Sequence, residues 1–496
     1  MNQLTTAKLG ALARKTLIEE DFLAEMPPEV VEEAREIDEN KILSAFDVKD
    51  LRSLQWSSID NKTSRDLDQV EYAESLANGD IRLLIGIADV DAFVPKNSTI
   101  DNFAAQNTTS VYAGNVVFPM LPERLSTDLT SLLEGFDRLA VVTEMSVGAD
   151  GNIKSSEVYR ALIHNYAKLS YEEIGAWLDG KTATPEAVAK VEGLEEQIRI
   201  QQKAAAHLQE LRKQNGALEF ESIESAPEVS GEFITGIEIV HSNAARKIIE
   251  NFMIAANVEM AEFLEKRNVA SLRRIVKTPE RWSKIVDIAA DFGENLPGAP
   301  DSKSLADFLA RRKAADPLHY PDLSLSIIKL IGSGDYIVQE AGAETGGHFG
   351  LAVRDYTHST APNRRYSDLI VQRLVKSALE NKPSPYALEE LEAIAEHCNE
   401  RESAAKKVER KVRKIIAASV MAAHINEDFE AIVTGKTQGG TFARILRPPV
   451  DGRIVEGEEN TEVGDKVRVR LLAANSENGF IDFGVKKQAE DSGSKL

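Results

Sequence analysis

Apolar positions in the first third of the chain follow the period of β-strands. Residues 81–88 form a short, mostly apolar run of the kind found in buried strands. Asn78-Gly79 immediately before this run favours a tight hairpin, so residues 70–77 are expected to pair with it. A further short strand is predicted over residues 139–145. The pattern therefore predicts a sheet-forming region that starts near residue 51.

The middle of the chain changes to the period of α-helices. Apolar residues recur three or four positions apart over residues 185–214, 242–267 and 388–423, and again after Arg364. From residue 429 to residue 483 the period changes once more, to short strands separated by glycine-containing turns. That spacing is typical of a small all-β barrel.

The two ends of the chain are polar. Residues 19–39 are strongly acidic and surround Pro27-Pro28, which predicts two short helices around a proline turn. This segment is either a solvated lead-in or a region that binds a partner. The patterns together predict an α+β chain in four parts, a short helical acidic segment (1–50), a mixed domain (51–425), a barrel (427–487) and a disordered tail (488–496).

Composition and charge limit the classes of function. The chain has 496 residues, a formal net charge of −21 and one cysteine, Cys398. A single cysteine forms no internal disulfide and speaks against a cysteine-based metal site, so a reducing, cytoplasmic location is expected. No apolar run approaches the roughly 20 residues that span a bilayer, so no membrane partner is expected.

The acidic excess argues against loose binding to nucleic acid unless basic residues are segregated. Such a cluster occurs near the end of the predicted helix over 388–423, between Lys406 and Lys414. It would contact a nucleic-acid backbone or form a solvated helix face. The predicted barrel adds Arg444, Arg447, Arg468 and Arg470.

Three aspartates within nine positions are the first candidate for chemistry. Asp66 and Asp68 are two residues apart, so an extended backbone projects both to one side, and Asp60 joins them if the chain bends. Clustered carboxylates repel one another unless a cation such as Mg²⁺ or Mn²⁺ compensates. Two such ions can activate a water and stabilise the leaving oxygen of a phosphodiester. Aspartates before a strand also act as turn formers, and this alternative fits the spacing equally well.

Paired arginines are the second candidate. Arg364 and Arg365 lie beside Asp368 at the expected start of a helix. A guanidinium binds phosphate bidentately, and a helix N-terminus adds its dipole. The alternative is an ordinary salt-bridged helix start.

Five motifs follow one another in a characteristic order. They are the stretch from Ile59 to Gln69, Ile87-Ala88-Asp89-Val90, Phe118 to Pro122, Ile249 to Asn257, and His348 to Arg373. This order resembles the catalytic RNB domain of the ribonuclease II / ribonuclease R family, over about residues 57–375 and more loosely to residue 423. The predicted barrel resembles the RNA-binding OB fold at the family's C-terminus.

The resemblance implies an RNB catalytic domain with a deep channel that admits only single-stranded RNA. Asp60, Asp66 and Asp68 align with the family's catalytic aspartates, and Asp68 aligns with the one whose loss is expected to be most damaging. Arg364 aligns with the arginine that steadies the scissile phosphate. The implied cofactor is Mg²⁺ or Mn²⁺.

The resemblance also implies contacts to RNA. Tyr112 and Tyr171 align with aromatic residues that stack on or clamp terminal bases, and Glu250 aligns with an acidic residue that touches the terminal nucleotide. Arg365 is expected to contribute to RNA binding beside Arg364. The tyrosines could instead be core residues, and Glu250 a solvated helix residue.

The chain departs from the family pattern at a metal ligand. Gln69 stands where the family usually has a fourth aspartate. Its side-chain carbonyl can ligate a metal together with Asp60, Asp66 and Asp68, but it brings no charge. Weaker metal affinity, a shifted geometry or loss of activity is therefore expected.

The chain also departs from the pattern before the catalytic domain. About 55 residues precede this domain, too few for the family's two cold-shock barrels, so the RNA entry path is expected to differ.

Three functions are compatible with these features. The first is a 3′→5′ exoribonuclease that hydrolyses single-stranded RNA to nucleoside 5′-monophosphates, expected to act as a monomer. The second, motivated by Gln69, is an RNB-fold protein that binds RNA 3′ ends without degrading them. The third is an RNA-associated scaffold whose acidic N-terminal segment recruits a partner.

Overall fold

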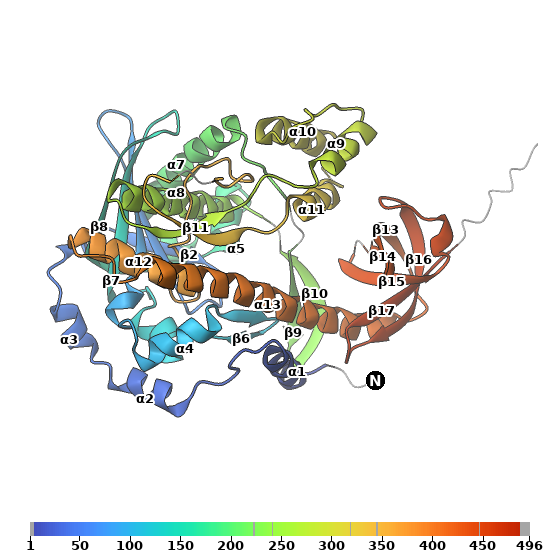
Figure 1. Cartoon of the computed structure of the whole chain (residues 1–496), viewed down its shortest axis with the longest axis horizontal. Helices are drawn as coiled ribbons and strands as arrows, with labels where there is room; N and C mark the ends of the chain where they lie inside the picture. The colour runs from blue at the N-terminus through green and yellow to red at the C-terminus, as the bar shows by residue number, and fades with distance from the viewer. Residues whose placement is uncertain are drawn as a thin grey trace, which may run out of the picture.

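The computed structural model describes residues 4–221, 224–240, 242–317, 319–343, 346–445 and 447–486. These residues form a mixed sheet covered by helices, a long helix α13 (Leu388–Met421) and a closed barrel at one end (Figure 1). The α+β class predicted from the sequence is confirmed, while the predicted disordered tail at 488–496 lies outside the described residues. Within the ranges just given, none of the helices carries an apolar stretch sufficient to cross a bilayer.

The main sheet has the strand order β1-β8-β2-β3-β4-β7. Strands β3 and β4 form the predicted hairpin, and Gly79 in the turn adopts a φ of +88°, which glycine tolerates without strain. Strand β8 pairs with β7 along its first part and with β2 along its last part, so the sheet curls round. The strands are β1 (Lys49–Asp50), β2 (Trp56–Asp60), β3 (Gln69–Ser75), β4 (Ile81–Ala88), β7 (Asp137–Val147) and β8 (Ile153–Ser170).

Both faces of this sheet are buried, because alternate side chains along each strand point to opposite faces. One face, with Trp56 and Leu84, packs against α4 (Thr99–Asn107), α12 (Tyr366–Leu379) and the first turns of α13. The other face, with Ile59 and Ile85, packs against α5 (Tyr171–Leu178), α7 (Leu194–Gln214) and α8 (Ala244–Lys266). The ends of β2 and β3 are therefore held between two hydrophobic layers.

Two helix predictions need correction. The helix expected over 185–214 is broken into α6 (Glu186–Ala189) and α7, because Gly193 between them has a φ of +80°. In the acidic segment, the first expected helix is absent from the described residues, because α1 (Thr6–Glu19) ends where that segment begins. The helices there are α2 (Pro28–Glu36), which starts at the second proline, and α3 (Glu39–Ser44).

The barrel confirms the prediction of a small all-β domain. Its strands close in the order β13-β14-β15-β17-β16. The last turns of α13 place Ala418 and Met421 in the barrel core, so this helix packs in both domains. The barrel strands are β13 (Asp428–Thr437), β14 (Gly440–Ile445), β15 (Val450–Glu456), β16 (Lys466–Asn475) and β17 (Phe480–Val485).

The remaining elements had no clear sequence signal. They are η1 (Val90–Ala92), β5 (Val111–Ala113), β6 (Val116–Phe118), η2 (Leu125–Leu129), β9 (Glu224–Ser230), β10 (Phe233–Val240), β11 (Ser271–Ile275), α9 (Trp282–Asp291), α10 (Ser302–Ala315), α11 (Tyr320–Ile331), β12 (Asp335–Gln339), η3 (Ala422–His424) and η4 (Glu458–Asn460).

Candidate active site

The candidate site lies where β2 ends and β3 begins. Ser57 pairs with Glu71 in antiparallel register, and the Gln69 side chain donates to the Ile59 carbonyl at 3.3 Å. The loop between the strands folds back on Asp60, whose Oδ1 accepts hydrogen bonds from the Ser64 hydroxyl (2.8 Å) and the Asn61 N–H (2.6 Å). Asp60 is therefore fixed at the strand end, next to the start of α5.

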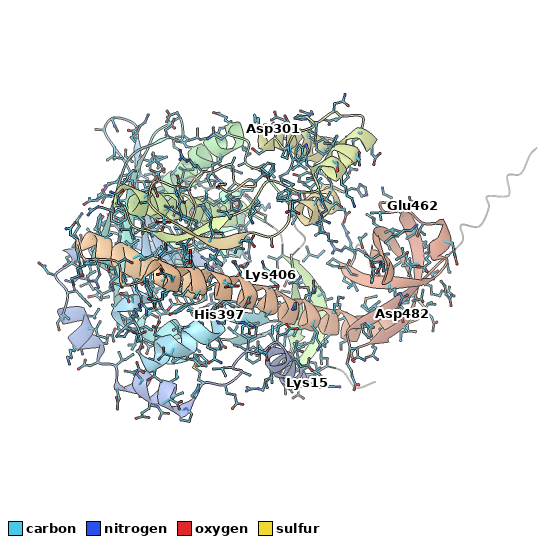
Figure 2. The ribbon with its side chains drawn as sticks, viewed as in Figure 1. Lys15, Asp301, His397, Lys406, Glu462 and Asp482 are labelled. Atoms are coloured by element: carbon cyan, nitrogen blue, oxygen red, sulfur yellow. The ribbon has the colours of Figure 1, made fainter. Side chains whose placement is uncertain are left out.

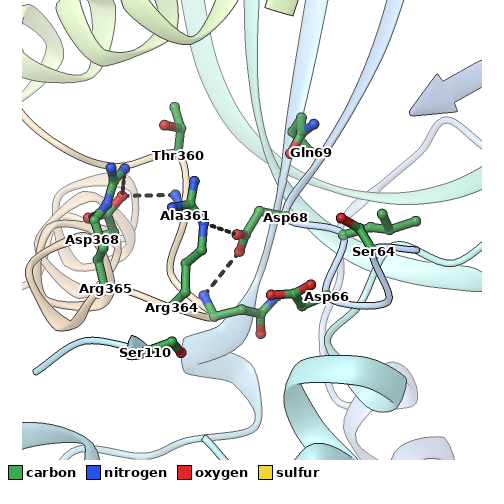
Figure 3. A network of polar contacts seen from close by, with 12 residues as sticks. Ser64, Asp66, Asp68, Gln69, Ser110, Thr360, Ala361, Arg364, Arg365 and Asp368 are labelled. Carbon is green, nitrogen blue, oxygen red and sulfur yellow. Dashed lines mark hydrogen bonds and ion pairs between the residues drawn. The ribbon is translucent and has the colours of Figure 1, made fainter. Parts of the chain in front are cut away.

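Asp68 joins this strand end to the loop before α12. Its side chain is buried, with the residue 3% exposed, and it accepts hydrogen bonds from the Asn363 N–H (3.1 Å) and from Arg364 Nε (3.2 Å) (Figure 3). Burial raises the pKa of Asp68 to about 7, while the Arg364 charge and the Asn363 N–H oppose that shift. The structure thus brings together Asp68 and Arg364, which are 296 positions apart in the sequence.

Arg364 is anchored at only one of its nitrogens. The side chain is 43% exposed, and its two terminal nitrogens form no hydrogen bond within the part of the chain that the structure describes. A guanidinium held through Nε presents both terminal N–H groups in one plane, which is the geometry that binds a phosphate bidentately.

Asp66 lies close enough to act on the other two aspartates. Burial raises the pKa of Asp60 and of Asp68, and in each case the Asp66 charge raises it further. Asp66 Oδ2 accepts a hydrogen bond from the Tyr112 hydroxyl at 3.0 Å. Tyr112 is 39% exposed, so its side chain borders the site and is not a core residue.

Arg365 does not face this group of carboxylates. Its Nε and Nη2 donate to Asp368 at 2.8 and 2.6 Å, and Asp368 is fully buried at the start of α12. Asp368 also accepts the Ala361 N–H, so the pair braces the loop that carries Arg364. Arg365 thus forms the salt-bridged helix start that the sequence offered as an alternative, and its contribution to RNA binding stays a prediction.

A cavity of ≈ 1260 Å³ opens between the mixed domain and the barrel. Tyr171 and Glu250 both line it, and Arg246 covers the Tyr171 ring at 4.4 Å from its centroid. Basic and acidic side chains occur in equal number on its walls, so the lining is not a purely basic channel. The basic residues that line it are Arg212, Lys213, Arg246, Lys247, Lys313 and Arg447.

Most of these basic residues escaped the sequence analysis, because they are scattered over several elements and belong to no motif. Arg212, Lys247 and Arg447 form no ion pair among the described residues, so their charges are available to a ligand in the cavity. The only signal in the sequence was the spacing of Lys247 and Glu250, three residues apart on one face of a predicted helix.

Three of the six basic residues between Lys406 and Lys414 form ion pairs, namely Lys406, Lys407 and Lys411, whereas the other three form none among the described residues, so a contact with a nucleic-acid backbone stays a prediction. Lys406, labelled in Figure 2, pairs with Glu402 of the same helix at 2.6 Å. Four other basic residues that were predicted to contact a nucleic-acid backbone also form ion pairs with carboxylates of this chain. These pairs are Lys407 with Glu20, Lys411 with Glu19, Arg444 with Asp451, and Arg470 with Asp428.

The aspartates fit a divalent cation that keeps part of its water shell. Among the described residues, no three His, Cys, Asp or Glu side chains surround a common point. Mg²⁺, however, is usually bound by one or two carboxylates together with waters and substrate phosphates. In the part of the chain that the structure describes, the one ion pair formed by Asp60, Asp66 and Asp68 is that of Asp68 with Arg364, so their negative charge exceeds the positive charge paired with them. Gln69 turns its amide nitrogen to the backbone and points away from Asp66 and Asp68 (Figure 3).

Family comparisons agree with this two-domain architecture. The RNB domain matches residues 48–381, and the RNase II-type exonuclease C-terminal S1 domain matches residues 427–486. An α+β domain with a carboxylate–arginine site, followed by a five-stranded barrel, defines an RNB-type protein. The chain belongs to the RNB family.

Individual relatives extend this comparison. Ribonuclease R of Vibrio parahaemolyticus is 32% identical over 472 residues, which are 88% of this chain and 55% of the relative. The chain therefore spans little more than half the length of that relative.

Solved structures show the same fold. Mycoplasma genitalium RNase R in complex with ribose-methylated single-stranded RNA superposes with a TM-score of 0.86 at 24% identity, covering 96% of this chain and 77% of that one. Yeast Ssd1, described as a pseudonuclease, superposes with a TM-score of 0.68 at 17% identity, covering 92% and 57%. The fold alone therefore does not decide whether a protein cleaves RNA.

Proposed function

We propose that this chain is a 3′→5′ exoribonuclease that hydrolyses single-stranded RNA to nucleoside 5′-monophosphates. The observation that carries the proposal is the Asp68–Arg364 pair, which holds an arginine through Nε beside two further aspartates and leaves its terminal nitrogens free among the described residues. Such a group can hold a phosphodiester beside the carboxylates. The relation to ribonuclease R supports RNA as the substrate.

Each residue of the site has a role in this proposal. Asp68 and the Asn363 N–H position Arg364, which binds the scissile phosphate and opposes the negative charge that develops on it. Asp60, Asp66 and Asp68 would hold Mg²⁺ or Mn²⁺, whereas the Gln69 side chain, which points away from Asp66 and Asp68, is left out of this ligand set. When bound, this cation supplies an activated water and neutralises charge on the leaving oxygen.

The cavity residues hold the RNA chain. A base that displaces Arg246 from the Tyr171 ring would stack there whatever its identity, at about 1–3 kcal/mol per base. Glu250 lines the same cavity, and its carboxylate would accept a hydrogen bond from a ribose hydroxyl. Lys247, Arg212 and Arg447 offset the charges of the phosphates.

The test is an incubation of the full chain with single-stranded RNA labelled at its 5′ end, in Mg²⁺ or Mn²⁺. The proposal expects a ladder that shortens from the 3′ end and releases nucleoside 5′-monophosphates. A blunt duplex of the same sequence serves as the control and is expected to be cleaved much more slowly. RNA that stays intact, or that is cut internally, contradicts the proposal.

A second candidate function is the capture of RNA 3′ ends without cleavage. It is favoured by Gln69, which contributes no charge and whose amide nitrogen is bonded to the Ile59 carbonyl. An inert chain that binds RNA with a free 3′ end, and that gains cleavage with Gln69→Asp, would establish it. Efficient cleavage by the unmodified chain excludes it.

A further inference from the structure

A lysine from a neighbouring strand holds the turn that follows Asp60. Strand β8 runs parallel to β2, and Lys168 on β8 is the register partner of Ser58. The Lys168 Nζ donates hydrogen bonds to the backbone carbonyl of Lys62, at 3.1 Å, and to that of Ser64. One ammonium group thus ties two carbonyls of the turn to the main sheet.

Lys168 lies on the same face of the sheet as Asp60. Ile59 and Leu169 are register partners, and both belong to the hydrophobic layer formed with α5, α7 and α8. Side chains alternate between the two faces along a strand, so Asp60, which follows Ile59, and Lys168, which precedes Leu169, project to the opposite face. The lysine therefore reaches the turn from the side on which Asp60 lies.

The turn that Lys168 holds is the one that fixes the Asp60 carboxylate. Asp60 Oδ1 accepts the Ser64 hydroxyl at 2.8 Å and the Asn61 N–H at 2.6 Å, and the Ser64 N–H donates to the Asn61 carbonyl at 3.0 Å. Ser64 links the two ends of this arrangement, because its carbonyl accepts from Lys168 while its hydroxyl donates to Asp60. A movement of the turn away from β8 would withdraw the Ser64 hydroxyl from Asp60.

Among the described residues, the Lys168 ammonium group forms no ion pair. Its hydrogen bonds there go to the two carbonyls of the turn, and the residue is half-buried. Donors that carry a charge form stronger hydrogen bonds than neutral donors. The contact with the turn thus accounts for the placement of this side chain.

A second tether holds the chain around Asp66. The Ser131 hydroxyl donates to the Arg65 carbonyl at 2.7 Å and accepts the Leu67 N–H at 2.9 Å. These contacts flank Asp66, whereas the carbonyls that bind Lys168 come earlier in the turn. The two tethers therefore act on different parts of the aspartate stretch.

We propose that Lys168 is a positioning residue of the active site. By holding the turn on the sheet, it keeps the Ser64 hydroxyl on Asp60 and so fixes the orientation in which the Asp60 carboxylate would meet a divalent cation. Outer contacts that orient a metal ligand typically contribute about 10–100-fold to metal affinity or activity. The inference rests on the proposed function, because that function uses Asp60 as a ligand of Mg²⁺ or Mn²⁺.

The test compares Lys168→Met, which removes the donors and keeps an apolar stem, with Lys168→Arg, which restores donors. Lys168→Met is expected to lower the single-turnover rate on labelled single-stranded RNA about tenfold or more. It is expected to raise the Kd for Mn²⁺ by a similar factor, measured without RNA by electron paramagnetic resonance of free Mn²⁺. Lys168→Arg is expected to keep most of the rate and of the affinity. The Kd for RNA, measured in a chelator, is expected to stay unchanged in both variants, because the cavity residues are untouched.

A double-mutant cycle with Ser64→Ala tests the route through Ser64. Each single variant is expected to lower the rate and the Mn²⁺ affinity about tenfold, and the double variant is expected to lower them little further. Two residues that act independently would instead multiply their effects to about 100-fold in the double variant.

Lys96→Met is the matched control. The Lys96 Nζ also donates to a backbone carbonyl, that of Pro385 at 2.6 Å, and pairs with Glu390 at 2.8 Å, away from the aspartates. This variant is expected to lose some stability in urea while its rate and its Mn²⁺ affinity stay unchanged, which is also how Lys168→Met would behave if Lys168 served the fold alone. If Lys168→Met fails to fold by circular dichroism, Lys168→Gln replaces it and is expected to show the same losses, because its shorter side chain does not reach both carbonyls.

Three outcomes would overturn the inference. They are a folded Lys168→Met chain whose rate and Mn²⁺ affinity stay within about threefold of the unmodified chain, a Lys168→Arg chain that loses as much as Lys168→Met, and a double variant that shows the full product of the single effects.

The proposed function can fail separately. A chain that never cleaves RNA but loses Mn²⁺ affinity with Lys168→Met refutes the nuclease and sustains the role of Lys168. A nuclease whose rate and Mn²⁺ affinity ignore Lys168→Met does the opposite, and a chain that neither cleaves RNA nor binds Mn²⁺ overturns both.

Discussion

Replacement of Asp68 with asparagine separates the placement of Arg364 from the stability of the fold. The variant keeps the size of the side chain and an oxygen for the Asn363 N–H, but removes the charge that holds Arg364 Nε at 3.2 Å. At this distance the attraction is about 5 kcal/mol at an effective dielectric constant of about 20, before any desolvation. Because Arg364 is 43% exposed, solvent replaces most of it, so the expected loss of folding free energy is about 1 kcal/mol.

The expected effect on catalysis is much larger. Loss of one preorganised group that faces developing charge typically lowers kcat about 10²–10³-fold. We therefore expect Asp68→Asn to lower the single-turnover rate on labelled single-stranded RNA at least about 100-fold. The midpoint of chemical unfolding is expected to change only slightly.

Asp50→Asn is the matched control, because Asp50 forms an exposed ion pair with Arg52 at 2.7 Å, outside the site. Its rate and stability are expected to equal those of the unmodified chain. A folded Asp68→Asn enzyme with a rate within threefold of the unmodified chain would refute the reasoning. So would a loss of several kcal/mol in stability, because Asp68 would then act mainly on the fold.

Three further predictions concern stability, pH and RNA affinity. Arg373→Met removes the guanidinium that forms 2.8 Å ion pairs with Asp91 and with the buried Asp101. The free energy of unfolding, measured in urea, is expected to fall by about 3–5 kcal/mol. A fall of less than about 1 kcal/mol would contradict this prediction. Burial lowers the pKa of His348 to about 4, below the value near 6.5 expected in the unfolded chain, so the unfolded state binds more protons between these values. Stability should thus fall as the pH drops from about 6.5 to about 4, and thermal unfolding of His348→Gln should show a weaker dependence over that window; an identical dependence would refute the assignment. Lys247→Glu is expected to raise the Kd for single-stranded RNA and to flatten its salt dependence, as measured by fluorescence anisotropy, and an unchanged slope would place the RNA elsewhere.

The sequence predicted those helices and strands whose apolar and polar residues alternate with a regular period. The β3–β4 hairpin, α8, α12, α13 and the barrel carry their signals within their own residues, as runs of two-residue or 3.6-residue period and as turn residues. The order of motifs along the chain also sufficed to indicate the RNB family. Strand β8 was not predicted from the sequence. It is 18 residues long and pairs first with β7 and then with β2, so its side chains do not follow a single alternation of apolar and polar residues.

Tertiary structure decided what the candidate residues contact. The sequence placed Arg364 and Arg365 side by side, but only the folding of the loop before α12 directs the first to Asp68 and the second to Asp368. The positive charge of α13 was visible in the sequence, whereas the pairing of Lys407 with Glu20 and of Lys411 with Glu19 depends on the packing of α1.

The sequence by itself therefore determined the class of fold, the family and the set of aspartates, because each is written in the order and spacing of neighbouring residues. Only the tertiary structure decided that the terminal nitrogens of Arg364 form no hydrogen bond among the described residues, that cations from α7 and α8 line the cavity, and that Glu71 lies fully buried on β3. The physical reason is that charge pairing and burial are set by distances in space, and residues far apart in the chain set those distances.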